Sequence, residues 1–246
     1  MHLTTTPSLR IGLWGVSVST PHVAPDSSMA VARVAVTLSN DGSATSAGGK
    51  VAVTIKSPSG DAVSVATLLS PPVPAGGSVD VVFESIVVNG TAGGANLSQP
   101  IALWSVDTPS LYTATVDLSP SAGGAADAVT VTFGIRTLSF TSEGGFLLNG
   151  VPTILKGGCV HHDNGALGSA TIGRAEERRV ETLKKNGYNA IRTSHNPVSP
   201  AFLDACDRLG MLVMDEAFDC WEKGKNHDDY HVWFDEWWQR DMYVDC

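Results

Sequence analysis

The sequence predicts an immunoglobulin-like β-sandwich over residues 1–138, followed over residues 139–246 by an α/β domain with parallel strands. The first prediction rests on a series of short alternating strands between Gly, Pro and Ser turns. The second rests on a β-α-β-α-β order with short connections. Composition changes at residues 137–140, because residues 1–138 hold five Lys/Arg and eight Asp/Glu, whereas residues 139–246 hold eleven and seventeen.

Six segments of the first domain have the alternating pattern of strands and end at turn signals such as Asn40-Asp41-Gly42. Because no cluster of titratable residues accompanies them, we expect this domain to act as a scaffold, with Trp104 and Tyr112 in its core. Residues 133–150 predict a hairpin between the domains, which we expect to close the bottom of the second. The six predicted strands cover residues 29–38, 50–56, 62–68, 78–88, 111–118 and 128–133.

Three apolar segments of the second domain each run into polar residues. Residues 153–158 lead into 159–163, the segment 189–197 begins apolar and ends polar, and residues 211–214 lead into 215–221. In sheets of parallel strands, ligands bind at the carboxyl ends of the strands. The three polar ends therefore predict a site at one edge of the sheet.

Two helices connect these strands, and their ends carry recognisable signals. Residues 176–186 place Val180 and Leu183 on one face, and Gly187 stops this helix. Residues 200–209 follow Ser199 as N-cap and precede Gly210. Short connections of this kind predict parallel strands with right-handed crossovers.

Charge and composition exclude several classes of partner. A net charge of −9 argues against nucleic acid and against an anionic membrane surface. The sequence has no apolar run of about 18 residues, the usual minimum for a membrane span. The N-terminus has no basic and apolar signal-peptide pattern, and localisation stays open. The four cysteines lack metal-finger or CxxC spacing, so we expect reduced thiols in the core or in loops.

Several motifs, in the same order, resemble glycoside hydrolase family 2, the group of β-galactosidases, β-glucuronidases and β-mannosidases. Residues 218–241 are most similar to bacterial β-galactosidases. The resemblance implies that the second domain is an incomplete (β/α)8 TIM barrel, represented by its first three β/α units. The motifs occupy residues 103–112, 133–136, 146–150, 156–157, 161–163, 189–197 and 215–216.

The resemblance also implies a retaining hydrolysis of β-glycosides, without a cofactor. Retaining glycosidases use an acid/base carboxyl and a nucleophilic carboxylate about 5 to 5.5 Å apart. In the family the acid/base lies in an Asn-Glu pair after the fourth barrel strand, and the nucleophile follows several strands later. This sequence has no Asn-Glu pair, so we assign a catalytic role to none of its residues, including Glu216. We expect the chain to be an inactive part of a longer hydrolase.

The family resemblance implies a substrate-binding role for several of the polar residues. His161 resembles a histidine that contacts the sugar, Arg192 an arginine that holds the nucleophile's carboxylate, and His195 a histidine that hydrogen-bonds sugar hydroxyls. Imidazole and guanidinium groups suit these tasks, and an indole offers an apolar face for a pyranose ring. The predicted substrate-binding residues are His161, Asp163, Arg192, His195, Asn196, Glu216 and Trp221.

Simpler interpretations stay open for some of these residues. His161 and Asp163 are also compatible with capping a strand-to-helix loop. Arg192 at a strand end is also a suitable partner for a structural carboxylate, either Asp215 or Glu216. The aromatic residues 234, 237 and 238 are better explained as the buried face of a helix than as a sugar platform.

Two rival functions differ in class from a glycosidase. A metal hydrolase would gather His161, His162, Asp163, His195 and Glu216 around an ion. Adjacent side chains of an extended strand point to opposite faces, however, so His161 and His162 cannot easily both bind it. Metal-binding relatives use a Glu and a His at positions corresponding to Cys220 and Glu222 here, so we expect no metal. The second rival is a non-catalytic carbohydrate-binding remnant, which would expose the open edges of an incomplete barrel.

Overall fold

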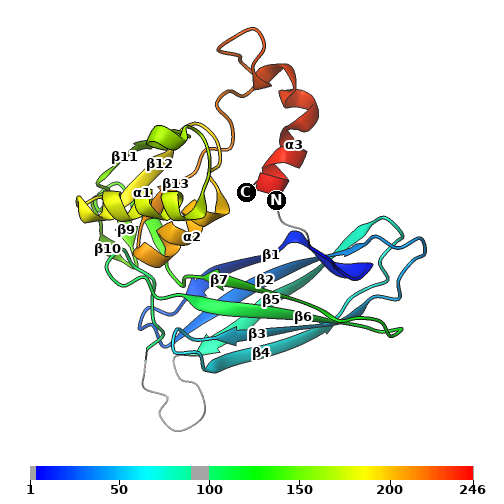
Figure 1. Ribbon diagram of the computed structural model, residues 1–246. Coiled ribbons are helices and arrows are strands. Elements are labelled where there is room, and N and C mark those ends of the chain that lie inside the picture. The colour runs from blue at the N-terminus through cyan, green and yellow to red at the C-terminus, as the bar shows by residue number, and fades with distance from the viewer. Residues whose placement is uncertain (1–3, 90–99, 246) are drawn as a thin grey trace. The chain divides into compact units, whose positions relative to one another are not determined.

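The computed structural model describes residues 4–89 and 100–245, and the chain divides into two compact units (Figure 1). The first unit comprises Met1–Trp104 and Ser110–Val151, and the second comprises Ser105–Pro109 and Pro152–Cys246. The structure thus places the hairpin strands β8 (Leu138–Thr141) and β9 (Gly145–Leu148) in the first unit, whereas the sequence-based boundary at residue 138 assigned them to the second.

The side chain of Asn149 accounts for the position of this hairpin. Its Nδ2 donates to the carbonyl of Trp104 at 3.0 Å, and its Oδ1 accepts from the backbone N–H of Thr137 at 2.9 Å. Both partners belong to the first unit. These bonds join residues far apart in sequence, so local patterning gave no sign of them.

The first unit is a sandwich of two antiparallel sheets, with strand orders β1-β2-β5 and β4-β3-β6-β7. All six predicted strands are present with small differences at their ends. The strands are β1 (Leu9–Val23), β2 (Met29–Asn40), β3 (Gly49–Lys56), β4 (Ala62–Leu69), β5 (Ser78–Asn89), β6 (Tyr112–Pro120) and β7 (Asp127–Phe133).

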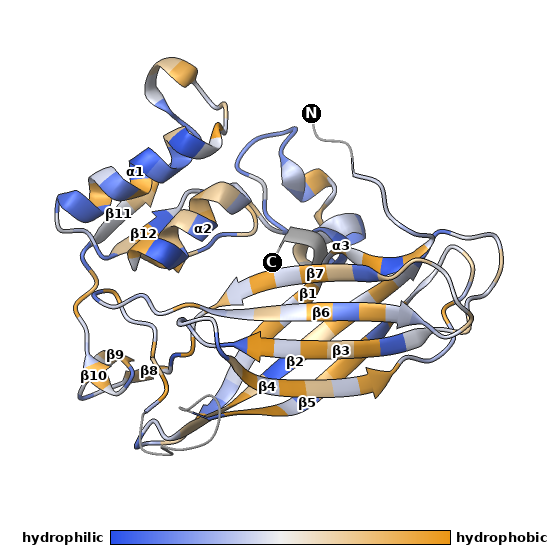
Figure 2. Ribbon diagram, turned by 60° about the horizontal axis from the view of Figure 1, so that its bottom comes forward, coloured by the Kyte–Doolittle hydropathy of each residue, from blue (hydrophilic) through white to orange (hydrophobic). Residues whose placement is uncertain are grey.

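Alternation along the strands produces a single core between the two sheets. In β2 every second residue is buried, and Val34, Val36 and Leu38 are fully covered. Residues from both sheets join this core, including Val53 and Val116. Figure 2 shows hydrophobic residues recurring along the strands of both sheets. Burial of alternate apolar side chains is the driving force that holds the sheets face to face.

Tyr112 lies in this core as predicted, with an exposed fraction of 3%. Trp104 is also buried, with an exposed fraction of 1%, but it is not among the residues of this core. Tyr112 begins β6, and its hydroxyl accepts a hydrogen bond at 3.0 Å from the backbone N–H of Ala102. This arrangement resembles the tyrosine corner of immunoglobulin-like domains. Burial raises the pKa of Tyr112, so the hydroxyl stays neutral.

Strand β1 is absent from the predicted strands, and its position explains why. It is an edge strand that pairs with β2 alone, so Pro21 removes no hydrogen bond needed within the sheet. Its register shifts between Ile11 and Val16, where Gly12 and Gly15 interrupt the alternation. The sequence pattern of a regular strand is therefore broken in two places.

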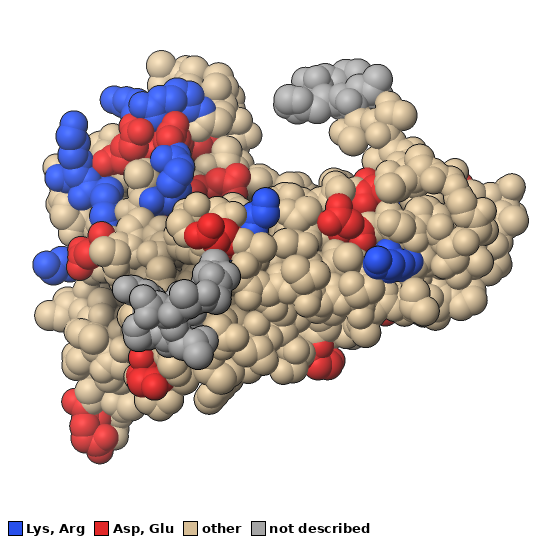
Figure 3. Space-filling view, turned by 90° about the horizontal axis from the view of Figure 1, so that it is seen from below, with Lys and Arg blue, Asp and Glu red and all other residues tan. Residues whose placement is uncertain are grey.

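The second unit contains a parallel sheet of three short strands, ordered β11-β12-β13, with the helices between them as predicted. On the face shown in Figure 3, charged side chains gather over this unit and are widely spaced over the sandwich. The short strand β10 (Val151–Pro152) lies where the first unit ends and pairs with β9 in the hairpin sheet. The elements of the second unit are β11 (Gly157–Val160), η1 (Gly165–Leu167), α1 (Gly173–Lys185), β12 (Ala190–Thr193), α2 (Pro200–Leu209), β13 (Leu212–Met214), η2 (Tyr230–Val232) and α3 (Phe234–Asp245).

Helix α2 matches its prediction at both ends. Ser199 accepts from the backbone N–H of Phe202, Pro200 occupies the first turn, and Gly210 has a φ of 75°. Helix α1 begins at Gly173, earlier than the predicted Glu176, and ends before Gly187, which has a φ of 85°. In the part of the chain that the structure describes, no helix is long and apolar enough to cross a bilayer.

The first strand of this sheet begins later than residue 153, where the sequence placed it, because residues 153–156 make a different set of hydrogen bonds. The Oδ1 of Asn189 accepts from the backbone N–H of Lys156 at 2.7 Å, and its Nδ2 donates to the carbonyl of Ile154 at 2.9 Å. A side chain thus takes the place of a neighbouring strand. Regular pairing with β12 starts at Gly157.

Candidate active site

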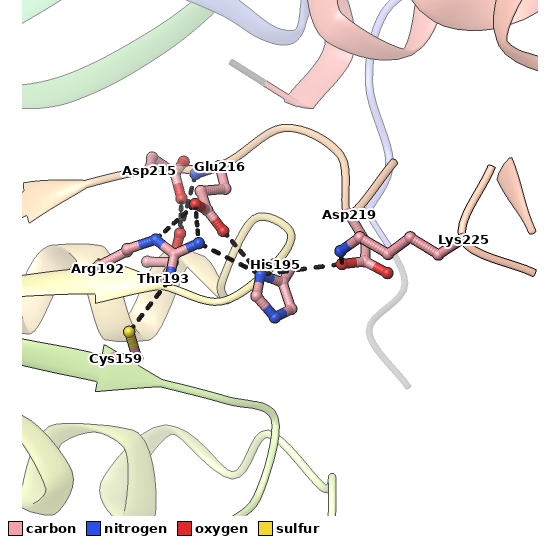
Figure 4. Close-up of polar contacts among 8 residues, drawn as sticks. All are labelled: Cys159, Arg192, Thr193, His195, Asp215, Glu216, Asp219 and Lys225. Carbon is pink, nitrogen blue, oxygen red and sulfur yellow. Dashed lines mark hydrogen bonds and ion pairs between the residues drawn. The ribbon is translucent and has the colours of Figure 1, made fainter. Parts of the chain in front are cut away.

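Polar residues follow each of the three parallel strands, and the register brings them to the same end of the sheet. Cys159 of β11 lies opposite Arg192 of β12, which lies opposite Met214 of β13. His161 follows β11 directly, His195 follows β12 after Ser194, and Glu216 follows β13 after Asp215. The predicted gathering of polar side chains at the carboxyl end of the sheet is therefore present (Figure 4).

Arg192 is the centre of this cluster. The Oε1 of Glu216 lies 2.6 Å from both Nε and Nη2 of Arg192, while Nη1 donates to the Sγ of Cys159 at 3.2 Å. Cys159 and Glu216, through these hydrogen bonds, raise the pKa of Arg192 above its usual value. The structure thus contains the pairing with a local carboxylate that the sequence left open, and the partner is Glu216.

His195 lies beside this ion pair. Its Nδ1 is 3.2 Å from the Oε2 of Glu216 and 3.8 Å from the Oδ1 of Asp219. An ionised carboxylate only accepts hydrogen bonds, so the contact with Glu216 requires a proton on Nδ1 and leaves Nε2 as the acceptor of a neutral ring. The peptide bond between Ser194 and His195 is cis.

Thr193 fixes the start of the loop after β13. Its hydroxyl donates to the Oδ1 of Asp215 at 2.5 Å and accepts from the backbone N–H of Glu216 at 3.0 Å. Thr193 is fully buried, so both bonds are shielded from water. The two acidic residues therefore have different partners, because the side chain of Asp215 contacts Thr193 and that of Glu216 contacts Arg192.

Cys159 is a member of the cluster that the sequence did not single out. Its thiol is exposed, and Ser194 and Arg192 lower its pKa. Cys206 contrasts with it, because burial raises the pKa of that thiol to about 12. Cys159 belongs to the cluster because it lies opposite Arg192 in the register of β11 and β12. The sequence alone does not give this register.

The remaining predicted residues differ in how close they lie to Arg192. The ring of His161 meets the ring of His195 edge-on, with centroids 5.4 Å apart. Asp163 lies 3.4 Å from the Nη2 of Arg179, on helix α1, and Asn196 is exposed. The structure thus brings His161, Arg192, His195 and Glu216 together, but not Asp163 or Asn196.

Trp221 lines a separate shallow hollow. Its indole is half exposed and packs against the rings of Phe218 and Phe234, at 5.5 and 5.6 Å between centroids. The hollow has a volume of about 410 Å³, and Asp219 connects it to the contact with His195. Among the residues the structure describes, no group of three or more His, Cys, Asp or Glu is placed to hold a metal ion.

The fold and the site define a class of protein, a β-sandwich followed by an α/β domain whose parallel strands carry polar residues at their carboxyl ends. Sequence profiles identify the family. Residues 16–136 match the profile of glycosyl hydrolases family 2, and residues 141–231 match its TIM barrel domain. The chain belongs to glycosyl hydrolase family 2, as its motifs predicted, and it contains the sandwich and the start of the barrel domain.

Individual relatives agree with this assignment. Beta-galactosidase BoGH2A of Bacteroides ovatus is 40% identical over 98% of this chain and 26% of its own length. A family 2 member from Bacteroides cellulosilyticus has a TM-score of 0.79 at 38% identity, covering 97% of this chain and 29% of that one. A β-glucuronidase of Bacteroides uniformis has a TM-score of 0.75 at 27% identity, covering 91% and 26%. The chain thus spans about a quarter of the length of these relatives.

Proposed function

We propose that this chain supplies sugar-binding residues of a retaining β-glycosidase, with a β-galactoside as substrate. The observation that carries the proposal is the cluster of Arg192, His195 and Glu216 at the ends of adjacent parallel strands. A relative named β-galactosidase, 40% identical over nearly the whole chain, supports the choice of sugar. Other relatives of similar fold are named β-glucuronidases, so the choice needs a direct test.

The three strands β11, β12 and β13 correspond, in this proposal, to the first three strands of an eight-stranded barrel. Their parallel order and their short helical crossovers support the correspondence. In this proposal the barrel part of the chain begins after the hairpin, because β8 and β9 belong to the first unit. The carboxyl ends of all barrel strands open on one face, which is where the substrate would bind.

Each residue of the cluster has a chemical task in this proposal. The Nε2 of His195, an acceptor in the neutral ring, takes a hydrogen bond from a sugar hydroxyl, and His161 adds a second contact beside it. Arg192 holds carboxylates ionised through charge-assisted hydrogen bonds. Trp221 presents an apolar face to a pyranose ring. Asp163, Asn196 and Glu216 complete the proposed substrate-binding set.

The proposal assigns neither the acid/base nor the nucleophile to this chain. Both carboxylate oxygens of Glu216 already have partners, because Oε1 contacts Arg192 and Oε2 contacts His195. The 246-residue chain alone is therefore expected to release no nitrophenol from nitrophenyl glycosides above background. Measurable release by this chain that disappears in Glu216→Gln would show that Glu216 is the catalytic carboxylate.

The decisive test uses the protein expressed from the whole reading frame that contains this sequence. Nitrophenyl β-galactoside, β-glucuronide and β-mannoside are compared as substrates. His195→Ala is expected to lower both kcat and kcat/KM by about 2 to 4 kcal/mol in activation free energy, because contacts to sugar hydroxyls tighten in the transition state. Arg192→Met is expected to lower kcat and kcat/KM further, since the nucleophile's carboxylate, no longer paired with the guanidinium, protonates more readily.

His227→Ala is the matched control for these variants. The side chain of His227 is 97% exposed and contacts only its neighbour Asp228 among the described residues, so its loss should leave the rates unchanged. Rates near wild type for both His195→Ala and Arg192→Met on all three substrates would refute the proposal. A preference for a sugar other than galactose would change the substrate but keep the site.

A further inference from the structure

Helix α1 carries a buried pair of opposite charges one turn apart. Glu176 and Arg179 have side-chain exposures of 3% and 16%, and the Nη1 of Arg179 lies 3.4 Å from the Oε1 of Glu176. The same carboxylate oxygen accepts from the Nδ2 of Asn164 at 3.1 Å. Buried ion pairs are often no more stabilising than apolar residues of similar volume. Their presence here therefore calls for a role other than stability.

The other arm of the Arg179 guanidinium reaches the end of strand β11. Its Nη2 donates to the carbonyl oxygen of His161 at 2.6 Å and lies 3.4 Å from the Oδ1 of Asp163. The carbonyl of His161 also accepts from the backbone N–H of Asp163 at 2.8 Å. Two donors thus fix the plane of the peptide that follows His161, and a fixed peptide plane limits the directions open to the side chain.

The segment of residues 161–163 has few other contacts among the residues that the structure describes. His161, His162 and Asp163 are all exposed, so apolar packing contributes little to their position. The Nε2 of His162 lies 3.2 Å from the carbonyl of Pro197, which ties the segment to the loop after β12. Arg179, braced against the ring of Phe202 at 5.7 Å, is the corresponding tie to α1.

We propose that Glu176 and Arg179 form a positioning pair that holds the end of β11 so that His161 faces His195. Glu176 keeps the guanidinium in place and neutralises its charge, and Arg179 holds the main chain of His161. Neither residue touches the sugar. The inference rests on the proposed function for the part that His161 plays in binding the sugar, but the positioning itself is open to a test without any substrate.

That test measures amide hydrogen exchange in the 246-residue chain. Arg179→Met removes both hydrogen bonds while keeping an unbranched side chain of similar length. In Arg179→Met, the hydrogen-exchange rate of the Asp163 amide is expected to rise by roughly tenfold or more, which corresponds to the loss of a hydrogen bond from a charged donor. Arg179→Lys retains one charged donor and should raise the exchange rate of the Asp163 amide less. Glu176→Gln, which is isosteric, should also raise this rate, because the ion pair that keeps Arg179 in place is lost.

Arg208→Met is the matched control, because Arg208 of α2 pairs with Glu177 of α1 and not with the end of β11. It should leave exchange at Asp163 unchanged. Amides of β12 should exchange as in the wild type in every variant, which shows that the unit is folded. Unchanged exchange at Asp163 in Arg179→Met, or an equal rise in Arg208→Met, would overturn the positioning pair.

A double-mutant cycle in the protein from the whole reading frame then tests the link to function. A misplacement of about 1 Å costs up to about 100-fold in rate, so Arg179→Met is expected to lower kcat/KM by 10- to 100-fold. In a His161→Ala background the same change should cost less than about threefold, because its target is gone. Equal losses in both backgrounds would show a general structural effect and overturn the inference. Full activity of His161→Ala would instead refute the sugar-binding role of His161, whatever the exchange data show.

Discussion

Gly210 permits a sharp test of how the second unit is held together. It follows α2 with a φ of 75°, and a Cβ added there would lie 2.3 Å from the carbonyl oxygen of Val106. That oxygen accepts from the Nζ of Lys184, which also donates to the carbonyl of Gly210 at 2.8 Å. Gly210→Ala therefore introduces two penalties, backbone strain and a collision with residues 105–109.

Gly187 provides a control with the first penalty alone. It follows α1 with a φ of 85°, and a Cβ added there would meet nothing within 4 Å. An L-residue in this left-handed conformation costs about 1–2 kcal/mol, offset by about 0.4–1 kcal/mol from the reduced entropy of the unfolded chain. Gly187→Ala should therefore destabilise the unit by at most about 1.6 kcal/mol.

The additional cost at Gly210 follows from the displaced carbonyl. Val106 must move by about 1 Å to restore van der Waals contact, which breaks the bond from Lys184. Hydrogen bonds to charged groups contribute about 1.5–3 kcal/mol. The free energy of opening, read from hydrogen exchange of the β12 amides, should thus fall by about 2–3 kcal/mol more in Gly210→Ala than in Gly187→Ala.

This difference corresponds to roughly 30- to 150-fold in the exchange rate. In a Lys184→Met background the extra cost of Gly210→Ala should shrink, because the bond to Val106 is already absent. Equal effects of the two alanine substitutions, or a milder effect at Gly210, would refute the claim that close approach of residues 105–109 constrains this position.

Two further predictions concern single side chains. Tyr112→Phe leaves the partly buried N–H of Ala102 without its acceptor and should destabilise the sandwich by about 1–3 kcal/mol, measured from hydrogen exchange of the β6 amides. Tyr188→Phe in the second unit should leave the exchange of these amides unchanged. Iodoacetamide should alkylate Cys159 before Cys206 at neutral pH, because Ser194 and Arg192 lower the pKa of the Cys159 thiol and more of it is thiolate. Arg192→Met should slow this alkylation, and equal rates in the two proteins would contradict the role given to the guanidinium.

The sequence predicted those elements whose signals are local. Ser199, Pro200 and Gly210 define both ends of α2, because a capping hydroxyl, a fixed φ and a left-handed residue each act within one turn. Alternation defined six strands of the sandwich for the same reason. Edge strand β1 escaped prediction because Gly12, Gly15 and an unpaired position at Pro21 break its alternation.

Elements that depend on distant partners were less predictable. The late start of β11 follows from the side chain of Asn189, which bonds to Ile154 and Lys156 more than 30 residues earlier. The partner of Arg192 was narrowed to Asp215 or Glu216, but the choice depends on Thr193, whose hydroxyl binds Asp215 and leaves Glu216 for the guanidinium. Cys159 became visible only through its register with Arg192.

The hydrogen-bond partners that Arg192 already has determine how it could bind a second carboxylate. A guanidinium has five N–H donors. Here Nε and one arm contact Glu216, the other arm contacts Cys159, and Nη2 also lies 3.5 Å from the Nδ1 of His195. Glu216 and Cys159 take three of the five N–H groups, and the protonated Nδ1 of His195 accepts none, so two N–H groups remain for a further carboxylate. Glu216 therefore sets the orientation of Arg192, and a nucleophile held by the proposed site would meet a guanidinium that is already fixed in place, which reduces the entropy lost on aligning it.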